Sequence, residues 1–281
     1  MSLDRRITPA RPDLAAEFLR GRVEAERYVA GRERSIAAAN APLRRAPSDE
    51  APLETEALFG ERAVVYDEAG AWAWAQLPRD GYVGYLPAAA LAPPFEPTHR
   101  VAALRTHVYP GPSIKLPPRM ALSLGALLRV EASEGEFAVT SEGLRVYARH
   151  LAPMAEVETD FVAVAERFLE TPYLWGGRTS EGIDCSGLVQ AALRAAGIEA
   201  PRDSDMMETT LGAPIPVDDD LTGLRRGDIV FWKGHVGVLR DAETLLHANG
   251  WHMRVVSEPL AVARDRIAEN AYGAITSIRR L

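Results

Sequence analysis

The 281-residue sequence contains a single cysteine, Cys185, which excludes an internal disulfide and fits a reducing compartment. The basic pair Arg5 and Arg6 is not followed by the ~7–15 apolar residues of a signal peptide. No segment approaches the ~18 uninterrupted apolar residues of a membrane span. A formal net charge of −7 argues against a nucleic acid or an anionic membrane as the main partner. We therefore expect a cytoplasmic protein that has neither of these partners.

The remaining composition, 47% hydrophobic and 25% charged, is that of an ordinary globular protein, and the length allows two or three folded domains. The charge-rich residues 12–32 predict a helical lead-in, which we assign to an N-terminal segment of residues 1–45. Residues 46–56 (APSDEAPLETE) are expected to form an exposed connector.

Two blocks of short β-like runs follow this segment. In the first, Trp72 and Trp74 alternate with alanine, which is the period of a half-buried strand. Both blocks close on Leu-Ala-Pro, at residues 91–93 and again 60 residues later at 151–153. This offset predicts a duplicated small β-barrel, with one domain at residues 46–95 and a second at 96–155.

Residues 156–281 have a different texture. The run DFVAVAERFLE (160–170) has the apolar spacing of a core-facing helix, and CSGLVQAALRAAGI predicts a second helix that ends near Gly197. Strand-like runs follow, including GDIVFWKGHVGVLRD, TLLHANG and AITSIRRL. A helix that carries the cysteine, followed by antiparallel strands, indicates an α+β domain.

Cys185 lies between Asp184 and Ser186, at the expected first turn of its helix and after a glycine-rich loop. A lone cysteine is usually core material. A free thiol titrates near ~8.5, and the partial positive charge at a helix N-terminus favours the reactive thiolate. The surroundings of Cys185 therefore leave two interpretations open, a packing residue and a nucleophile.

A nucleophile needs a base, and the base needs an orienting partner. His235 and His247 lie on two strand-like runs joined by the turn LRDAET, so they can face each other across a hairpin at ~5 Å between Cβ atoms. Residues 185, 235 and 247 do not have the spacing of a compact zinc ligand pair, so we expect no metal.

Several motifs occur in one order: TPYLWGG, GIDCSGLVQAALRAAGI, PRDSDMM, GLRRGDIVFWKGHVGVLRD and LLHANG. Over residues 156–281 they closely resemble the NlpC family of cell-wall cysteine peptidases, which have a papain-like fold. The resemblance implies that Cys185 is the nucleophile, His235 the general base and then acid, and His247 the orienting residue. The family commonly has Asp and Ser on either side of the cysteine, which makes Asp184 and Ser186 candidate substrate contacts. No cofactor is implied.

The two β blocks resemble bacterial SH3-like domains, and the implied fold class is α+β, a papain-like domain preceded by two small SH3-like barrels. In the subgroup that cleaves γ-D-glutamyl-L-diamino acid bonds, the first SH3-like domain helps to close the cleft. By this resemblance Tyr82 (RDGYVGY) and Glu61 (LFGERA) contact the free amine of an N-terminal L-alanine, and Asp203 and Ser204 (PRDS) are further candidate contacts.

The implied function is a cytoplasmic endopeptidase that acts on murein tri- or tetrapeptides with a free N-terminal L-Ala, in cell-wall recycling. Whether the diamino acid is diaminopimelate or lysine stays open, as does the oligomeric state. Three alternatives remain: a papain-like amidase or acyltransferase with a non-peptide substrate, a catalytically silent wall-peptide-binding protein, and a structural protein whose cysteine is core.

Overall fold

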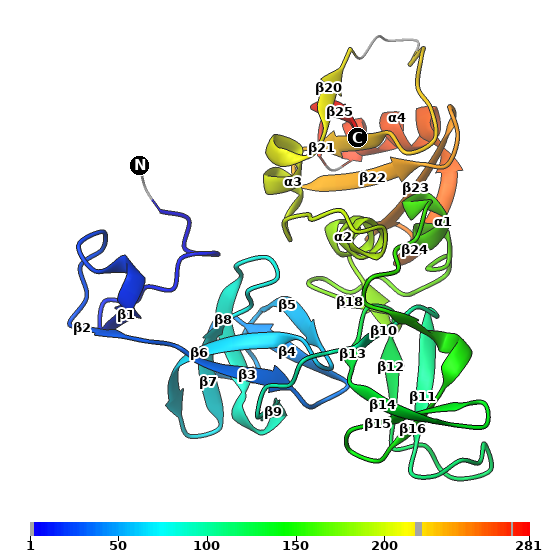
Figure 1. Cartoon of the computed structure of the whole chain (residues 1–281). Helices are drawn as coiled ribbons and strands as arrows, with labels where there is room; N and C mark the ends of the chain where they lie inside the picture. The colour runs from blue at the N-terminus through cyan, green and yellow to red at the C-terminus, as the bar shows by residue number, and fades with distance from the viewer. Residues whose placement is uncertain (1–2, 217–220, 271) are drawn as a thin grey trace. The chain divides into compact units, whose positions relative to one another are not determined.

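The computed structural model describes residues 3–216, 221–270 and 272–281, and its chain divides into two compact units. The first unit spans Met1–Ala155 and the second Glu156–Leu281 (Figure 1). The division falls where the sequence changes from β-like texture to alternating helix and strand signals. None of the helices in the described ranges is long and apolar enough to cross a membrane.

The N-terminal segment is not the helix expected at residues 12–32. It contains a short strand β1 (Leu14–Ala16), a 3-10 turn (Glu17–Leu19) and a strand β2 (Arg27–Val29) that pairs in parallel with β1. Gly21 has φ = 78°, a left-handed conformation that interrupts a right-handed helix in mid-course. The helical prediction was therefore wrong for this segment.

The first β domain is a seven-stranded antiparallel sheet that begins earlier than residue 46. Its order is β5-β4-β8-β7-β6-β3-β9. The strands are β3 (Arg32–Ile36), β4 (Asn40–Arg44), β5 (Leu53–Leu58), β6 (Arg62–Ala69), β7 (Trp72–Gln76), β8 (Val83–Pro87) and β9 (Leu91–Ala92). Residues 46–56 are thus not a connector throughout, because β5 starts at Leu53 and buries Thr55 and Glu56. Apolar side chains on β3 and β4, such as Ile36 and Leu43, close the core of this domain.

The second β region contains a three-stranded sheet, β13-β10-β17, and a five-stranded sheet, β12-β11-β16-β15-β14. The strands are β10 (His99–Val101), β11 (Arg105–Tyr109), β12 (Met120–Ser123), β13 (Leu127–Leu128), β14 (Val130–Glu134), β15 (Phe137–Thr140), β16 (Arg145–Tyr147) and β17 (Leu151–Pro153). The two Leu-Ala-Pro sites share their local structure, because each follows a 3-10 turn, Ala88–Ala90 or Ala148–His150, and starts a short strand.

The second unit has four α-helices and a six-stranded antiparallel sheet of order β20-β25-β21-β22-β23-β24 among its described residues (Figure 1). The helices are α1 (Phe161–Glu166), α2 (Cys185–Ala195), α3 (Ser204–Thr210) and α4 (Leu260–Asn270). The sheet strands are β20 (Ala213–Ile215), β21 (Ile229–Trp232), β22 (His235–Leu239), β23 (Thr244–Asn249), β24 (Arg254–Pro259) and β25 (Ser277–Arg280), and a separate pair consists of β18 (Arg178–Thr179) and β19 (Gly182–Ile183).

The local predictions for this unit agree with its structure. Asp160 caps α1 by accepting hydrogen bonds from the backbone N–H groups of Val162 and Ala163, although α1 ends at Glu166 rather than at residue 170. Gly197 has φ = 76° just beyond α2, where a left-handed residue ends a helix. The expected hairpin is present as the antiparallel pair β22 and β23.

The sheet of the second unit separates two hydrophobic clusters. On one side α2 and α3 pack against β21 and β22, through residues that include Cys185, Val189, Phe231 and Val236. A second cluster joins α4 to Val230, Trp232, Leu239 and Leu245 of the sheet. The sheet is therefore buried by helices on both sides, and α2 brings its N-terminus, with the cysteine, against β22.

Candidate active site

Cys185 is the first residue of α2 and is 8% exposed. The preceding residue, Asp184, is the N-cap and accepts a hydrogen bond of 2.6 Å from the backbone N–H of Gly187. The loop before the helix packs tightly against this first turn, because a Cβ on Gly187 would lie 2.4 Å from the carbonyl oxygen of Gly177. The glycines in this motif therefore let the loop backbone support the turn that presents the thiol.

A buried arginine that the sequence analysis did not single out fixes this arrangement. Arg202 donates from Nη1 to Asp184 Oδ1 at 3.0 Å and to Ser186 Oγ at 2.8 Å, and from Nη2 to Asp184 Oδ2 at 2.7 Å. The second Asp184 oxygen also accepts the backbone N–H of Gly176 at 2.9 Å. Asp184 and Ser186 are thus engaged within the protein and support the nucleophile loop, and their contact with substrate stays a prediction. The sequence analysis had selected the motif PRDS, which contains Arg202, but it named Asp203 and Ser204 as the candidate residues.

Those two residues, Asp203 and Ser204, lie at the start of α3. Asp203 occupies the N-cap position without a side-chain cap hydrogen bond, and Ser204 is buried. Their contact with substrate stays a prediction.

Burial dominates the titration of the thiol. It raises the pKa of Cys185 to about 12, and the Asp184 carboxylate adds to the increase. Hydrogen bonds from the backbone N–H groups of Val236 and Ser186 lower the pKa by a smaller amount. Burial therefore favours the neutral thiol and opposes the ionisation that we expect from the helix N-terminus.

His235 and His247 form the pair that the hairpin predicted. Nε2 of His235 lies 2.8 Å from Nδ1 of His247, and both side chains are buried. Gly237 lies two residues after His235 on β22, and a Cβ there would lie 3.1 Å from Cβ of His247. Burial lowers the pKa of His235 well below its usual value, and the neighbouring His247 adds to the decrease. Burial also lowers the pKa of His247. Both imidazoles are therefore neutral near pH 7.

The structure brings Cys185 and His235 to one site through their neighbours. Val236 follows His235 in the chain, packs in the same cluster as Cys185 and donates its backbone N–H to the sulfur. Tyr272 stacks on the ring of His235, with centroids 5.5 Å apart and planes 7° apart. Burial raises the pKa of the Tyr272 phenol, and the charge that Cys185 carries as a thiolate adds to the increase. No sequence motif had identified Tyr272.

A second phenol lies near the thiol. Burial raises the pKa of Tyr173, and the charges of Cys185 and Asp184 raise it further. Tyr173 belongs to the TPYLWGG motif that precedes the nucleophile loop. Both tyrosines are therefore neutral hydrogen-bond donors around Cys185 at physiological pH.

The far nitrogen of His247 has two further partners. Its Nε2 lies 2.8 Å from Oε1 of Glu258 and 2.9 Å from Nδ2 of Asn249. Arg266, on α4, donates to the same oxygen of Glu258. The two histidines thus belong to a longer chain of polar groups that extends from β22 across β23 to β24 and α4.

The predicted amine contacts Glu61 and Tyr82 both lie in the first unit, where Glu61 has a structural task. Its two carboxylate oxygens accept hydrogen bonds of 2.8 Å from Nη1 of Arg79, and one of them also accepts the backbone N–H of Leu58 at 2.9 Å. Glu61 is buried, so its charge is largely compensated by Arg79 within the domain.

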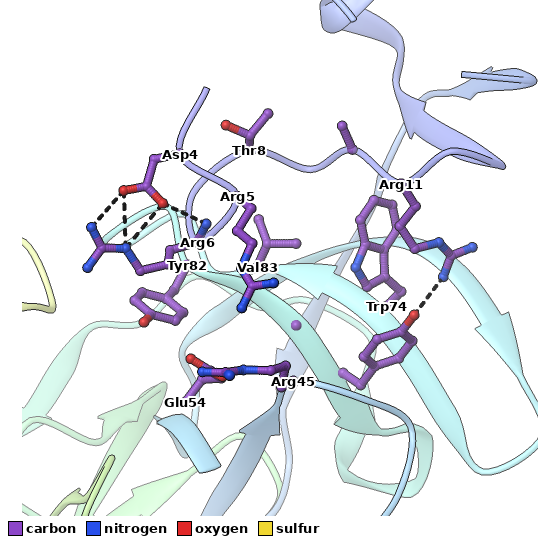
Figure 2. Close-up of a pocket in the computed structure, with 13 residues that line it drawn as sticks. Asp4, Arg5, Arg6, Thr8, Arg11, Arg45, Glu54, Trp74, Tyr82 and Val83 are labelled. Carbon is purple, nitrogen blue, oxygen red and sulfur yellow. Dashed lines mark hydrogen bonds and ion pairs between the residues drawn. The ribbon is translucent and has the colours of Figure 1, made fainter. Parts of the chain in front are cut away.

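Tyr82 packs in the core of the first β domain and is 3% exposed. It also lines a pocket of about 380 Å³ that includes Arg5, Arg6, Arg45 and Val83 (Figure 2). Contact of Tyr82 and Glu61 with a substrate amine stays a prediction.

Two regions of the chain match models of known protein families. A family model described as the NlpC/P60 family matches residues 170–267, which include Cys185, His235 and His247. A model described as the bacterial dipeptidyl-peptidase Sh3 domain matches residues 43–91, which include Glu61 and Tyr82.

Curated proteins match over parts of the chain. It is 28% identical over 221 residues to a gamma-D-glutamyl-L-lysine dipeptidyl-peptidase of Bacillus subtilis, across 70% of this chain and 72% of that protein. It is 32% identical over 102 residues to dipeptidyl-peptidase 6 of Lysinibacillus sphaericus, across 36% of each. The second match therefore spans about a third of the relative.

Among solved structures, an NlpC/P60 family protein from Bacillus cereus matches with a TM-score of 0.72 at 21% identity, over 89% of this chain and 99% of that one. This likeness shows the fold and confirms the α+β class expected from the sequence, whereas the presence of two SH3-like barrels stays a prediction.

Proposed function

Since residues 170–267 belong to the NlpC/P60 family of cysteine peptidases, we propose that the protein hydrolyses the γ-D-glutamyl-L-diamino acid bond of peptidoglycan peptides. The observation that carries this proposal is the packing of Cys185, at the start of α2, with Val236 of β22, next to the His235–His247 pair. The names of the relatives, dipeptidyl-peptidases that include one for a γ-D-glutamyl-L-lysine bond, support the choice of substrate.

The reaction follows from the protonation states at the site. Sγ of Cys185 attacks the γ-carbonyl carbon of the glutamyl residue while its proton passes to His235. Nε2 of His235 is already bonded to His247, so Nδ1 is the nitrogen that accepts this proton. Backbone N–H groups at the start of α2 are suited to stabilise the negative carbonyl oxygen, and the neutral phenols of Tyr173 and Tyr272 add possible donors.

The acyl transfer then completes in two steps. His235 returns the proton to the amine of the diamino acid as the C–N bond breaks, which leaves a thioester on Cys185. Water, deprotonated by His235, attacks that thioester and releases the glutamyl peptide with a regenerated thiol. No metal or cofactor is needed to balance these steps.

A finer part of the proposal concerns the amino end of the substrate. We propose that the preferred peptides carry a free N-terminal L-alanine, so that the released product is L-Ala-D-Glu, and that the enzyme serves cytoplasmic recycling of wall fragments. The match to a dipeptidyl-peptidase Sh3 domain supports this preference, since a dipeptidyl-peptidase acts two residues from an amino end. A site that pairs an ammonium group discriminates against the acetylated peptide, because burying its partners without the charge is costly.

The test uses synthetic peptides and the full chain. L-Ala-γ-D-Glu-L-Lys and the diaminopimelate analogue are each supplied with a free or an acetylated amino end, and products are identified by mass spectrometry. We expect release of L-Ala-D-Glu from the free peptides and its loss on acetylation, and no turnover of any peptide by Cys185→Ala, with an unchanged circular dichroism spectrum. Undiminished hydrolysis by Cys185→Ala would refute the assignment.

The same panel separates the alternatives. An amidase or acyltransferase on this scaffold would ignore the peptides and turn over a non-peptide amide. A silent binding protein would bind them without cleavage, and Cys185 would then resist a thiol-reactive electrophile.

A further inference from the structure

Glu258 lies at the end of the histidine chain, on β24, and no sequence motif pointed to it. Its Oε1 is 2.8 Å from Nε2 of His247, and its side chain is 12% exposed. Across the sheet β24 pairs with β23, so that Glu258 lies opposite Leu245, two residues before His247. The strand register thus places Glu258 near His247, and its side chain is long enough for the carboxylate to reach the imidazole.

The carboxylate is held in its ionised form. Although burial opposes ionisation of Glu258, the hydrogen bond from His247 and the charge of Arg266 hold its pKa below the usual value. Arg266 reaches the same Oε1 atom from α4. An ionised carboxylate is only an acceptor, so the hydrogen between Glu258 and His247 must reside on Nε2 of His247.

That hydrogen fixes the rest of the chain. A neutral His247 that carries its hydrogen on Nε2 has a bare Nδ1, which accepts a hydrogen bond from Nε2–H of His235 across the 2.8 Å contact. A neutral His235 that carries its hydrogen on Nε2 has a bare Nδ1 in turn. This is the only neutral form of His235 whose free nitrogen can take a proton from a thiol.

Asn249 competes for the same nitrogen. Its Oδ1 accepts the backbone N–H of His252 at 2.8 Å, so its Nδ2 is the atom that lies 2.9 Å from Nε2 of His247. An amide donor at that place favours the reversed chain, in which the hydrogen of His235 sits on Nδ1 and blocks it as a base. Hydrogen bonds with a charged partner are roughly twice as strong as neutral ones, so the carboxylate decides the direction.

We propose that Glu258 is a positioning residue, which orients the hydrogens of His247 and His235 so that His235 offers a bare nitrogen to Cys185. This inference rests on the proposed cysteine peptidase function. Arg266 holds the carboxylate in place and ionised. When His235 becomes an imidazolium during acylation, Glu258 compensates the new charge through His247.

Within the part of the chain that the structure describes, the charged and titratable groups that contact His247 or Glu258 are His235 on β22, Arg266 on α4 and His252, whose Nδ1 lies 4.0 Å from Oε1 of Glu258. Of these, Arg266 and a protonated His252 both oppose protonation of the histidine pair, so Glu258 is the group whose charge favours it.

The direct test is the tautomer of the wild-type protein. Imidazole ¹⁵N chemical shifts of the full chain near pH 7 report which ring nitrogen carries hydrogen. We expect His247 and His235 each to carry it on Nε2. A hydrogen on Nδ1 of either residue would overturn the proposal, and this outcome does not depend on any substrate or variant.

Variants supply the functional test. Glu258→Gln offers an amide in place of the carboxylate, so the reversed chain becomes available, and we expect kcat to fall about 10²–10⁴-fold with little change in KM. Glu258→Asp keeps the charge and should restore part of the loss. A matched control is Glu166→Gln, because Glu166 is an ion-paired carboxylate of the same unit that contacts Arg226 and Arg240 and no histidine.

The same variants are compared by the rate of Cys185 alkylation by iodoacetamide across pH. Glu258→Gln should slow alkylation near neutral pH and displace its profile, while Glu166→Gln should not. Alkylation needs no peptide substrate, so this profile tests the role of Glu258 even if the peptides are not cleaved. A failure of the proposed substrate can therefore be distinguished from a failure of the proposed role of Glu258. Equal kinetics and profiles for Glu258→Gln and wild type would reduce Glu258 to a structural role.

Discussion

Nε2 of His235 and Nδ1 of His247 lie 2.8 Å apart, on neighbouring strands of one hairpin. One nitrogen of each ring is therefore committed to the other ring, and the remaining nitrogens are Nδ1 of His235 and Nε2 of His247. The second contacts Glu258, and the first is the nitrogen that accepts the thiol proton in the proposed reaction. The contact between the two imidazoles is therefore a hydrogen bond between neutral rings in the resting enzyme, and it needs no charge on either ring.

The lowered pKa of His235 sets the pH dependence of activity. The base must be neutral to accept the thiol proton, and burial keeps His235 neutral down to a pH well below its usual ~6.5. We expect kcat/KM to fall in acid, below pH ~6.5, as His235 becomes protonated. Because the free amine of the peptide itself titrates near pH ~8, the thiol is followed by alkylation of the free enzyme, whose rate should still be rising at pH ~9 given the raised pKa of Cys185. An alkylation rate that levels off near pH 8 would contradict a neutral thiol.

The same histidines make stability depend on pH with a definite sign. The folded-state pKa values of His235 and His247 are lowered, so below pH ~6.5 the unfolded chain binds protons that the folded protein does not. The free energy of unfolding should decrease as pH falls through that region. Urea unfolding at pH 7 and pH 5 measures it. His247→Asn should reduce the difference, whereas His107→Gln, at an exposed position, should leave it unchanged.

Arg202 should be essential for stability. Its guanidinium is 1% exposed and is paired with Asp184 and Ser186. Arg202→Ala leaves the buried carboxylate of Asp184 without its partner, which costs about 3–5 kcal/mol. Equilibrium urea denaturation measures the loss, and Arg194→Ala, at an exposed ion pair with Glu199, is the matched control with an expected effect below ~1 kcal/mol. Similar values for the two variants would show that the Arg202 network contributes little.

Tyr272 should act through its ring more than through its hydroxyl. Stacking on His235 holds the imidazole plane, and aromatic pairs of this kind contribute about 0.5–1.5 kcal/mol. We expect Tyr272→Ala to lower kcat by about 2–10-fold and Tyr272→Phe to stay close to wild type in steady-state kinetics. If Tyr272→Phe is as impaired as Tyr272→Ala, the phenol itself takes part, for instance as a donor to the carbonyl oxygen.

Glu61 distinguishes a structural from a substrate role. Its carboxylate is the partner of the buried Arg79, so Glu61→Gln should lower the stability of the first unit. Thermal unfolding measures this loss of stability, and kinetics with free and acetylated peptides measure any role of Glu61 in substrate binding. A rise in KM for the free-amine peptide alone, with unchanged stability, would show that Glu61 binds the amine as the resemblance implied.

Local sequence patterns were sufficient where a few adjacent residues decide the structure. The apolar spacing after Cys185, its capping Asp184 and the stop at Gly197 specify α2, and the turn between His235 and His247 specifies the hairpin. The same kind of reasoning failed at residues 12–32, because charge and apparent periodicity do not reveal that Gly21 adopts a left-handed conformation. Strands β3 and β4 were missed within the segment assigned as residues 1–45 because they pair with strands up to about 60 residues away in the chain.

The sequence by itself determined the order of the motifs and, through their resemblance to a known family, predicted the nucleophile and its base, because such motifs consist of residue types at fixed local spacing. Only the tertiary structure decided which groups surround them. Three side chains come to the site from distant parts of the chain. Arg202 comes from the segment before α3, Glu258 from β24 and Tyr272 from the segment after α4. The tertiary structure also set the direction of the pKa shifts that favour a neutral thiol and neutral imidazoles, because these shifts depend on burial, and burial exists only once the chain has folded.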